Sequence, residues 1–197
     1  MTIARLNRRQ LLQGLALGVG ALSGVVWREA RAAPLPPKSI YRLDAGLVDQ
    51  DGRAFRLADL QGTPLVVSMF YANCDMVCPL IFETIKAAIA SAGPRAHDAL
   101  RVLMVSFDPA RDDVPALRAA ATAHGVDARW IVARAEPDTV RQIAAVLGVQ
   151  YRRLASGSYN HATVIEVVDP DGVIVQKSQQ LGGEDAGLVA ALRAQAH

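Results

Sequence analysis

The sequence predicts one α/β domain in which helices pack against a largely parallel β-sheet. Apolar runs at 65–71 and 100–107 have the length and continuity of buried central strands. Segments with apolar residues at helical spacing alternate with such runs, which is the pattern of parallel strands joined by helices. The chain has 197 residues, 51% of them hydrophobic, which is enough for one domain with a substantial core.

The predicted elements begin with a β-hairpin. Apolar residues alternate between Ile40 and Leu60 around the turn signal Asp49-Gln50-Asp51-Gly52. The strand 65–71 follows a Gly-Thr-Pro turn, and the helical spacing of apolar residues predicts a helix over 77–91. Gly93-Pro94 is expected to end this helix.

The second half of the chain continues the alternation and closes with another hairpin. The remaining predicted elements are strand 100–107, helix 113–124, strand 129–133, helix 137–147, strands 163–168 and 173–177, and helix 184–194. Asp169-Pro170-Asp171-Gly172 is a strong turn signal between the last two strands. This order predicts a thioredoxin-like, three-layer α/β sandwich with an N-terminal β-hairpin.

Residues 1–32 have the layout of a twin-arginine export signal. Arg8-Arg9 precede an apolar run over 11–27, and the small residues of Ala30-Arg31-Ala32 form a cleavage site. We expect cleavage after Ala32, which leaves residues 33–197 as a periplasmic domain. The alternative is an uncleaved anchor that holds the domain on the periplasmic side of the membrane.

The apolar run is poorly suited to span a membrane. It falls short of the roughly 20 apolar residues that a span needs, and Gln13 interrupts it. We therefore expect no stable membrane span in the mature form. Without residues 1–32 the chain has 16 basic and 18 acidic residues, and this nearly neutral balance argues against nucleic acid as a partner.

The only two cysteines, Cys74 and Cys78, follow the strand 65–71 in a C-x3-C arrangement. Loops at this end of a parallel strand are where α/β proteins place their sites. The next helix begins here, with Asp75 as a plausible N-cap, and its N-terminus favours thiolate at one or both cysteines. The pair can hold a soft metal ion or form a disulfide. A purely structural disulfide is the alternative, but so short a closed loop constrains the unfolded chain little.

A third donor is found at His161, directly before the strand 163–168. In thioredoxin-like folds this position lies opposite the cysteine turn, where redox enzymes usually keep a proline, and Asn160-His161-Ala162 has none. Two cysteines and one histidine suit copper, whereas zinc normally requires a fourth ligand. The other histidines are expected on the solvated surface: His97, His124 and His197.

Four stretches, together with Leu57-Ala58-Asp59-Leu60, resemble the SCO/SenC family of copper chaperones. They are residues 70–79, 105–112, 160–163 and 168–172. The resemblance implies that Cys74, Cys78 and His161 bind copper, Cu(I) or Cu(II), and that the cysteines form a redox disulfide. It also implies delivery of copper to the binuclear copper site of a respiratory oxidase or to another cuproprotein, or reduction of that site's thiols. Thiol reductants are further expected partners.

The resemblance also places Asp108 near the metal. Asp108 either orients a ligand or modulates charge there, or it is a turn residue that caps the strand end. The chain departs from the family at Asp75, where proline is usual, and at residues 1–32, where a cleavable signal replaces a membrane anchor. Met76, less common between the cysteines, is expected to be a packing residue rather than a thioether ligand.

Three other functions compete with the chaperone. A thiol–disulfide oxidoreductase without obligatory metal uses the same thiols, although the C-x3-C spacing and the missing proline argue against it. A peroxidase of the peroxiredoxin kind would need proline and threonine or serine where Val67 and Tyr71 stand. A thioredoxin-fold adaptor would act through a surface. We expect metal transfer, with oxidation of the thiolates releasing copper, rather than enzymatic turnover.

Overall fold

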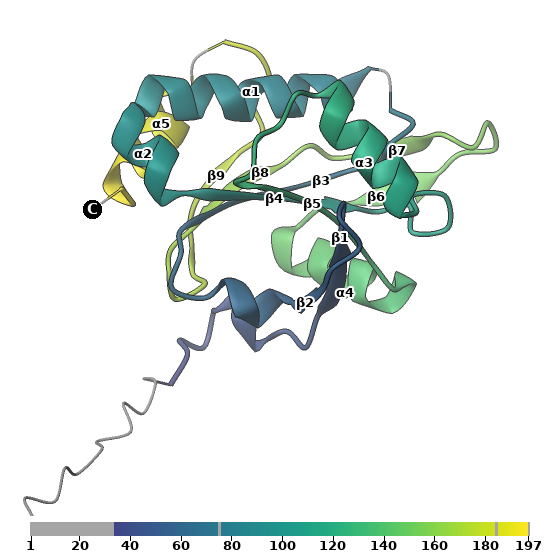
Figure 1. The fold of residues 1–197 in the computed structure, drawn as a ribbon, viewed down its shortest axis with the longest axis horizontal. Helices are drawn as coiled ribbons and strands as arrows, with labels where there is room; N and C mark the ends of the chain where they lie inside the picture. The colour runs from purple at the N-terminus through teal and green to yellow at the C-terminus, as the bar shows by residue number, and fades with distance from the viewer. Residues whose placement is uncertain (1–33, 75, 184, 197) are drawn as a thin grey trace, which may run out of the picture. The chain divides into compact units, whose positions relative to one another are not determined.

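A mixed seven-stranded β-sheet organises the domain (Figure 1). The computed structural model describes residues 34–74, 76–183 and 185–196. The strands of the main sheet are, in chain order, β1 (Gly46–Asp49), β2 (Ala54–Arg56), β3 (Leu65–Phe70), β4 (Arg101–Ser106), β5 (Trp130–Ala135), β8 (Ile165–Val168) and β9 (Ile174–Ser178). Their order across the sheet is β2-β1-β5-β4-β3-β8-β9.

The remaining elements are helices and one separate hairpin. The helices are α1 (Val77–Ala92), α2 (Pro94–Ala99), α3 (Val114–Ala123), α4 (Pro137–Leu147) and α5 (Ala186–Ala194), with 3-10 turns η1 (Ile40–Arg42) and η2 (Leu57–Leu60). Strands β6 (Tyr151–Arg153) and β7 (Tyr159–His161) pair with each other in a separate two-stranded sheet.

The centre of the sheet is parallel, as the alternation of strands and helices predicts. β3 pairs with β4, and β4 with β5, in parallel, while β8 runs antiparallel to β3 and to β9. The N-terminal hairpin β1–β2 joins the sheet through antiparallel pairing of β1 with β5. The predicted fold class, a three-layer α/β sandwich with an N-terminal hairpin, is confirmed.

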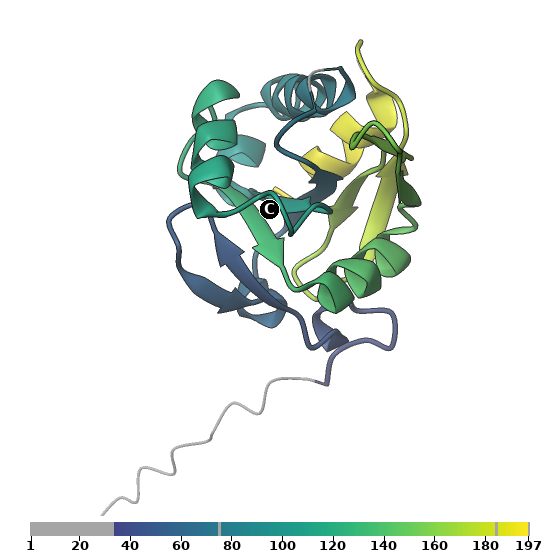
Figure 2. The same cartoon turned by 90° about the vertical axis from the view of Figure 1, so that its right-hand side faces the viewer.

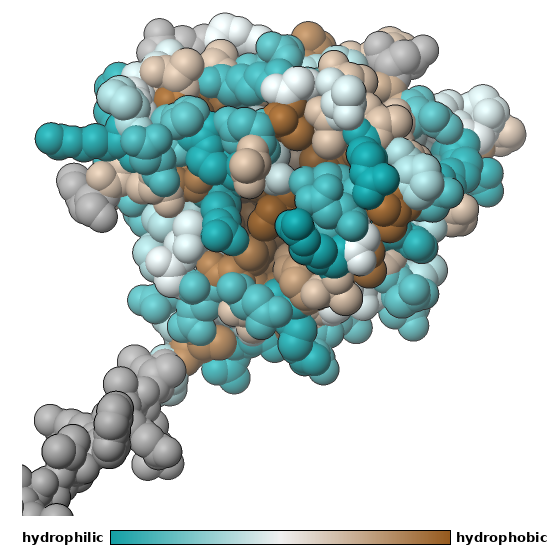
Figure 3. Space-filling model, in the orientation of Figure 1, coloured by the Kyte–Doolittle hydropathy of each residue, from teal (hydrophilic) through white to brown (hydrophobic). Residues whose placement is uncertain are grey.

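Helices cover both faces of the sheet. Helix α1 lies on one face and α4 on the other (Figure 2). On the α1 face, Phe82 contacts Phe70 edge-on, with ring centroids 5.7 Å apart, and stacks on Trp130 at 5.5 Å. On the other face, Val67 of β3 and Ile143 of α4 line the same narrow apolar crevice. Apolar side chains recessed among polar ones are visible on the surface in Figure 3.

The packing of β3 fixes the start of the candidate site. All six residues of this strand are buried, because its two neighbours and both helical layers enclose it. Burying a large apolar side chain contributes about 1.5–3 kcal/mol, so this strand is among the elements most firmly held. The loop that carries Cys74 therefore leaves the sheet from a rigid point.

Gly93-Pro94 ends α1 as predicted, but it also begins a short helix that the sequence analysis missed. Gly93 has φ = +99°, a conformation that favours glycine, and it turns the chain sharply. Pro94 then takes the first position of α2, where its fixed φ suits a helix and its missing N–H is not needed.

The second missed feature is the β6–β7 hairpin. Its turn is closed by a hydrogen bond of 2.8 Å from the N–H of Leu154 to the carbonyl oxygen of Ser158. Gly157 lies in this turn with φ = +86°. The strands are three residues long and polar, so they lack the apolar alternation that identifies a strand in a sequence. As a result His161 ends a strand, rather than lying in a loop before the next one.

Some predictions concern residues outside the described ranges. The export signal at 1–32, Asp75 and His197 are among them. Within the described residues, none of the helices combines the length and the apolar character needed to cross a bilayer.

Candidate metal site

The two cysteines lie where β3 passes into α1. Cys74 is half-buried in the connecting loop, and its backbone N–H donates to the carbonyl oxygen of Tyr71 at 3.2 Å. Cys78 is buried in the first turn of α1. Met76 occupies the N-cap position, although no side-chain hydrogen bond caps the helix from it. Instead the Cys74 sulfur accepts the backbone N–H of Cys78 at 3.2 Å, which partly satisfies a free donor of the first turn.

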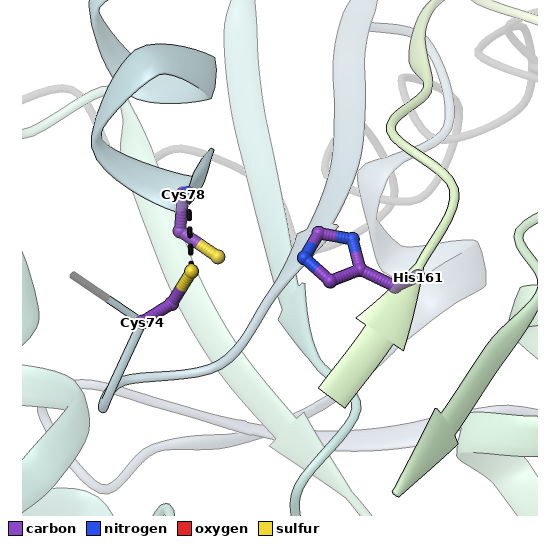
Figure 4. A group of neighbouring side chains, drawn as sticks. All are labelled: Cys74, Cys78 and His161. Atoms are coloured by element: carbon purple, nitrogen blue, oxygen red, sulfur yellow. Dashed lines mark hydrogen bonds between the residues drawn. The ribbon is translucent and has the colours of Figure 1, made fainter. Parts of the chain in front are cut away.

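His161 completes a three-residue group with these cysteines. It comes from the end of β7, and its side chain faces the two sulfur atoms (Figure 4). One potential ligand atom from each of Cys74, Cys78 and His161 lies within 4.8 Å of the other two. The three residues that the sequence analysis selected are thus brought together by the fold, from two segments more than 80 positions apart.

The two thiols differ sharply in acidity. The pKa of Cys74 is lowered to about 3, chiefly by the hydrogen bond from the Cys78 thiol and also by those from His161 and the backbone N–H groups of Cys78 and Met76. The pKa of Cys78 is raised, because its proton is held by Cys74 and because the side chain is buried. The reduced pair therefore holds one thiolate and one thiol.

The imidazole ring of His161 packs against two aromatic rings. The His161 ring lies 5.0 Å from that of Phe107 and edge-on to that of Tyr71 at 6.2 Å, measured between centroids. Its Nδ1 is 3.3 Å from the carbonyl oxygen of Ala162. These groups pack against the imidazole, and its hydrogen bond to Cys74 helps to orient the ring.

The other described histidines do not join the group. His97 is exposed and pairs with Asp98, as expected for a surface residue. His124 is different, because it stacks on Phe82 with ring centroids 4.0 Å apart. Burial lowers the pKa of His124, so its prediction as a solvated residue is wrong.

Asp108 is buried, and its hydrogen bonds and ion pair are with residues other than the three candidate ligands. Its carboxylate pairs with Arg111, and its backbone N–H donates to the Ser106 hydroxyl at 3.0 Å. The backbone N–H groups of Arg111 and Asp112 donate to its carbonyl oxygen. Asp108 thus closes the turn after β4, which agrees with the turn-residue alternative, and any influence on a ligand passes through its partners.

Asp112, which the sequence analysis did not single out, holds the cysteine loop. Its buried carboxylate accepts the backbone N–H of Ala72 at 2.9 Å and the hydroxyl of Ser106. Burial raises the pKa of Asp112, and these two hydrogen bonds oppose that rise. The only signal in the sequence was its place in the 105–112 stretch of the family resemblance.

Met76 does not pack against the core. Its exposed fraction is 76%, the largest among the exposed large hydrophobic residues of the described chain. The prediction that it is a packing residue is therefore wrong. Met76 lies at the N-cap of α1, before the first residue of the helix.

Comparisons with known proteins bear on the fold and the family of the chain. No curated protein matches it. Solved structures include a proposed electron transfer protein of Aquifex aeolicus VF5, with 25% identity and a TM-score of 0.71 over 79% of this chain and 92% of that one. Copper-bound ScoI of Bradyrhizobium japonicum has 22% identity and a TM-score of 0.65 over 77% and 96%.

A third structure, of BsSco, has 17% identity and a TM-score of 0.63 over 77% of this chain and 90% of that one. BsSco has a disulfide switch and is a member of the Sco family of cytochrome c oxidase assembly proteins. At such low sequence identities, these three structures show that the chain shares their fold. The sequence model of the SCO1/SenC family matches residues 38–196, and the chain therefore belongs to the SCO1/SenC family.

Proposed function

We propose that this protein binds one copper ion through Cys74, Cys78 and His161 and acts as a copper chaperone. In this role it delivers copper to the binuclear copper site of a respiratory oxidase, or reduces the thiols of that site before loading. The observation that carries the proposal is the convergence of three ligand atoms within 4.8 Å of one another. The copper in B. japonicum ScoI and the assembly role of BsSco's family support it.

The donor set fits copper by its chemistry. Two cysteine sulfurs and one imidazole nitrogen suit trigonal Cu(I), and a further weak ligand would accommodate Cu(II). A structural zinc site normally has four protein ligands, whereas this group, within the described residues, has three. The low pKa of Cys74 supplies one thiolate in advance. Binding then displaces the proton of Cys78, so copper uptake should release about one proton.

Release of copper is coupled to thiol oxidation. When both thiolates lose one electron each and join as a disulfide, both sulfur donors are lost and copper is set free. The electron pair passes to the disulfide of the recipient protein, whose two thiolates are thereby ready to accept the metal. Delivery and thiol reduction are then two outcomes of one exchange between paired cysteines.

A thiol–disulfide oxidoreductase without obligatory metal is the second candidate function. The acidic Cys74 beside a buried Cys78 favours it, because a thiolate is the attacking group in disulfide exchange. It does not depend on His161, which supplies only one of several hydrogen bonds that lower the pKa of Cys74, whereas copper binding needs the imidazole as a third ligand. Removal of His161 therefore distinguishes the two functions.

We also propose that the protein acts outside the cytoplasm. The twin-arginine pattern of residues 1–32 is the basis, with cleavage after Ala32 releasing residues 33–197 into the periplasm. Fractionation of cells that express the full chain, with N-terminal sequencing of the exported form, tests both points. A full-length protein in the membrane fraction would favour the anchored alternative.

The decisive experiment counts bound copper in reduced, anaerobic protein. Residues 34–197 form one compact unit, so a fragment of residues 33–197 is suitable. Wild type should retain one Cu(I) per chain in competition with a chelator. Cys74→Ala should lose it, and His161→Ala should hold it at least tenfold more weakly while disulfide exchange continues. A wild-type protein that cycles its disulfide but retains no stoichiometric copper would favour the oxidoreductase.

A further inference from the structure

The strand that carries His161 is not part of the main sheet. Among the described residues, β6 and β7 pair only with each other, over Tyr151–Arg153 and Tyr159–His161. An isolated two-stranded hairpin is at best marginally stable in water. The position of His161 against the cysteines therefore depends on the contacts that tie this hairpin to the body of the domain.

One such tie is polar and comes from Arg111. Its Nη2 donates to the carbonyl oxygen of Gly157, in the hairpin turn, at 2.6 Å. The same guanidinium lies over the ring of Tyr159, with its central carbon 5.8 Å from the ring centroid. Arg111 thus contacts the turn and the first residue of β7, two positions before His161.

Arg111 is in turn fixed from the body of the domain. Its Nε donates to the carboxylate of Asp108, which is 2% exposed. Asp108 directly follows Phe107, on which the His161 ring rests. The guanidinium therefore bridges a buried carboxylate on one side and the hairpin on the other. A lysine could pair with Asp108, but it lacks the planar set of donors that reaches both partners at once.

We propose that Arg111, anchored by Asp108, is a positioning residue that holds the β6–β7 hairpin so that His161 faces the two cysteine sulfurs. This inference rests on the proposed copper function for its purpose, but the positioning itself is a property of the metal-free protein. It also gives the resemblance of residues 105–112 to the family a physical role, since Asp108 acts on His161 through Arg111.

The first test uses reduced, metal-free protein and NMR signals of the His161 ring. Phe107 and Tyr71 belong to the body of the domain, so their ring currents shift these signals only while the hairpin is seated. In Arg111→Ala the shifts should move most of the way to unstructured values, and amide exchange in the hairpin should rise at least tenfold. Arg152→Ala is the matched control, because it removes an exposed guanidinium from the same hairpin.

The second test measures Cu(I) retention in five variants. Arg111→Ala should weaken copper roughly as much as His161→Ala does, and the double variant should be no weaker than His161→Ala alone. Arg111→Lys should fall between wild type and Arg111→Ala. Asp108→Asn, which keeps the shape of the side chain, should weaken copper in the same direction if Arg111→Ala fails to fold.

The two tests separate the failure of the inference from that of the proposed function. If wild type binds no copper, the chaperone proposal fails, while the NMR shifts still decide the role of Arg111. If His161 keeps its ring-current shifts in Arg111→Ala and in Arg111→Lys, the positioning role is overturned. Additive losses of copper in the double variant would overturn it as well.

Discussion

The two halves of the candidate site are built on supports of very different strength. The cysteine half lies between β3, buried along its whole length, and the sixteen-residue helix α1. The histidine half lies on a three-residue strand in a separate hairpin. A donor set made this way can keep its two sulfurs fixed while the third ligand moves. Under the proposed function the protein both holds and releases copper, and that asymmetry would then be an advantage.

Both halves are nevertheless tied to the same short turn after β4. Asp112 binds the cysteine loop through the backbone N–H of Ala72, and Arg111 binds the hairpin through Gly157. The Asp112 side chain is buried, whereas about a third of the Arg111 side chain is exposed. Water therefore competes more for the Arg111–Gly157 hydrogen bond than for the Asp112–Ala72 hydrogen bond, and the hairpin should open more readily than the cysteine loop.

The largest expected effect comes from removing the ring that both halves share. Phe107 is buried and contacts Tyr71 on the cysteine side and Tyr151, Tyr159 and His161 on the hairpin. Phe107→Ala should lower the free energy of unfolding by about 3–5 kcal/mol, because it removes the ring and leaves a cavity. Urea denaturation of the reduced protein measures this.

Phe107→Leu is the control for that prediction, since it keeps much of the apolar volume. It should cost less than half as much while still loosening the hairpin, which amide exchange would report. A loss below about 1 kcal/mol in Phe107→Ala would mean that the ring does not join the two halves.

The second prediction tests the tie to the cysteine half. Asp112→Ala leaves the backbone N–H of Ala72 and the hydroxyl of Ser106 without their buried acceptor. We expect a loss of about 2–3 kcal/mol in the free energy of unfolding, the cost of unsatisfied buried donors. Asp112→Asn keeps one acceptor oxygen and should lose less. Equal losses in the two variants would argue against the hydrogen bonds as the cause.

The hydrogen bonds of Asp112 and Arg111 could not be predicted from the sequence, whereas the cysteine half of the site could. The cysteine half was predictable because an apolar run, helical spacing and the C-x3-C motif are all local signals. The hairpin was not, because β6 and β7 are short and polar and pair across a turn. Asp112 and Arg111 act through hydrogen bonds to backbone atoms of Ala72 and Gly157, and a backbone partner leaves no mark on residue identity.

The position of a residue far along the chain was predictable only where the fold class itself determines it. His161 was expected opposite the cysteines because the strand order of a thioredoxin-like sheet brings those positions together. The exposure of Met76 and the stacking of His124 on Phe82 depend on the exact ends of two helices, α1 and α3. Such ends are the least certain part of any prediction from sequence.

The third prediction sharpens the difference between the two sulfurs. With a pKa of about 3, Cys74 stays a thiolate as the pH falls from 8 to 5, so its rate of alkylation should change little over that range. An ordinary thiol, with a pKa near 8.5, would lose roughly tenfold in rate for each pH unit below 7. Cys78, whose pKa is raised, should stay unreactive throughout.

Mass spectrometry of the reduced, metal-free protein distinguishes the two sites of alkylation. Cys74→Ser serves as the control, since it removes the reactive thiolate and should leave only the slow reaction of Cys78. A rate at Cys74 that falls tenfold for each pH unit would contradict the low pKa and the hydrogen-bond arrangement behind it.

The smallest expected effect is at Met76, which lies between the two cysteines yet belongs to neither half of the packing. Met76→Leu should change the free energy of unfolding by less than about 0.5 kcal/mol, because a residue with 76% of its surface exposed loses little on substitution. Leu80→Ala, one helical turn along α1 and also exposed, is the matched control. If Met76→Leu instead weakens Cu(I) retention while stability is unchanged, its thioether takes part in holding copper, and the cysteine half supplies three sulfur donors rather than two.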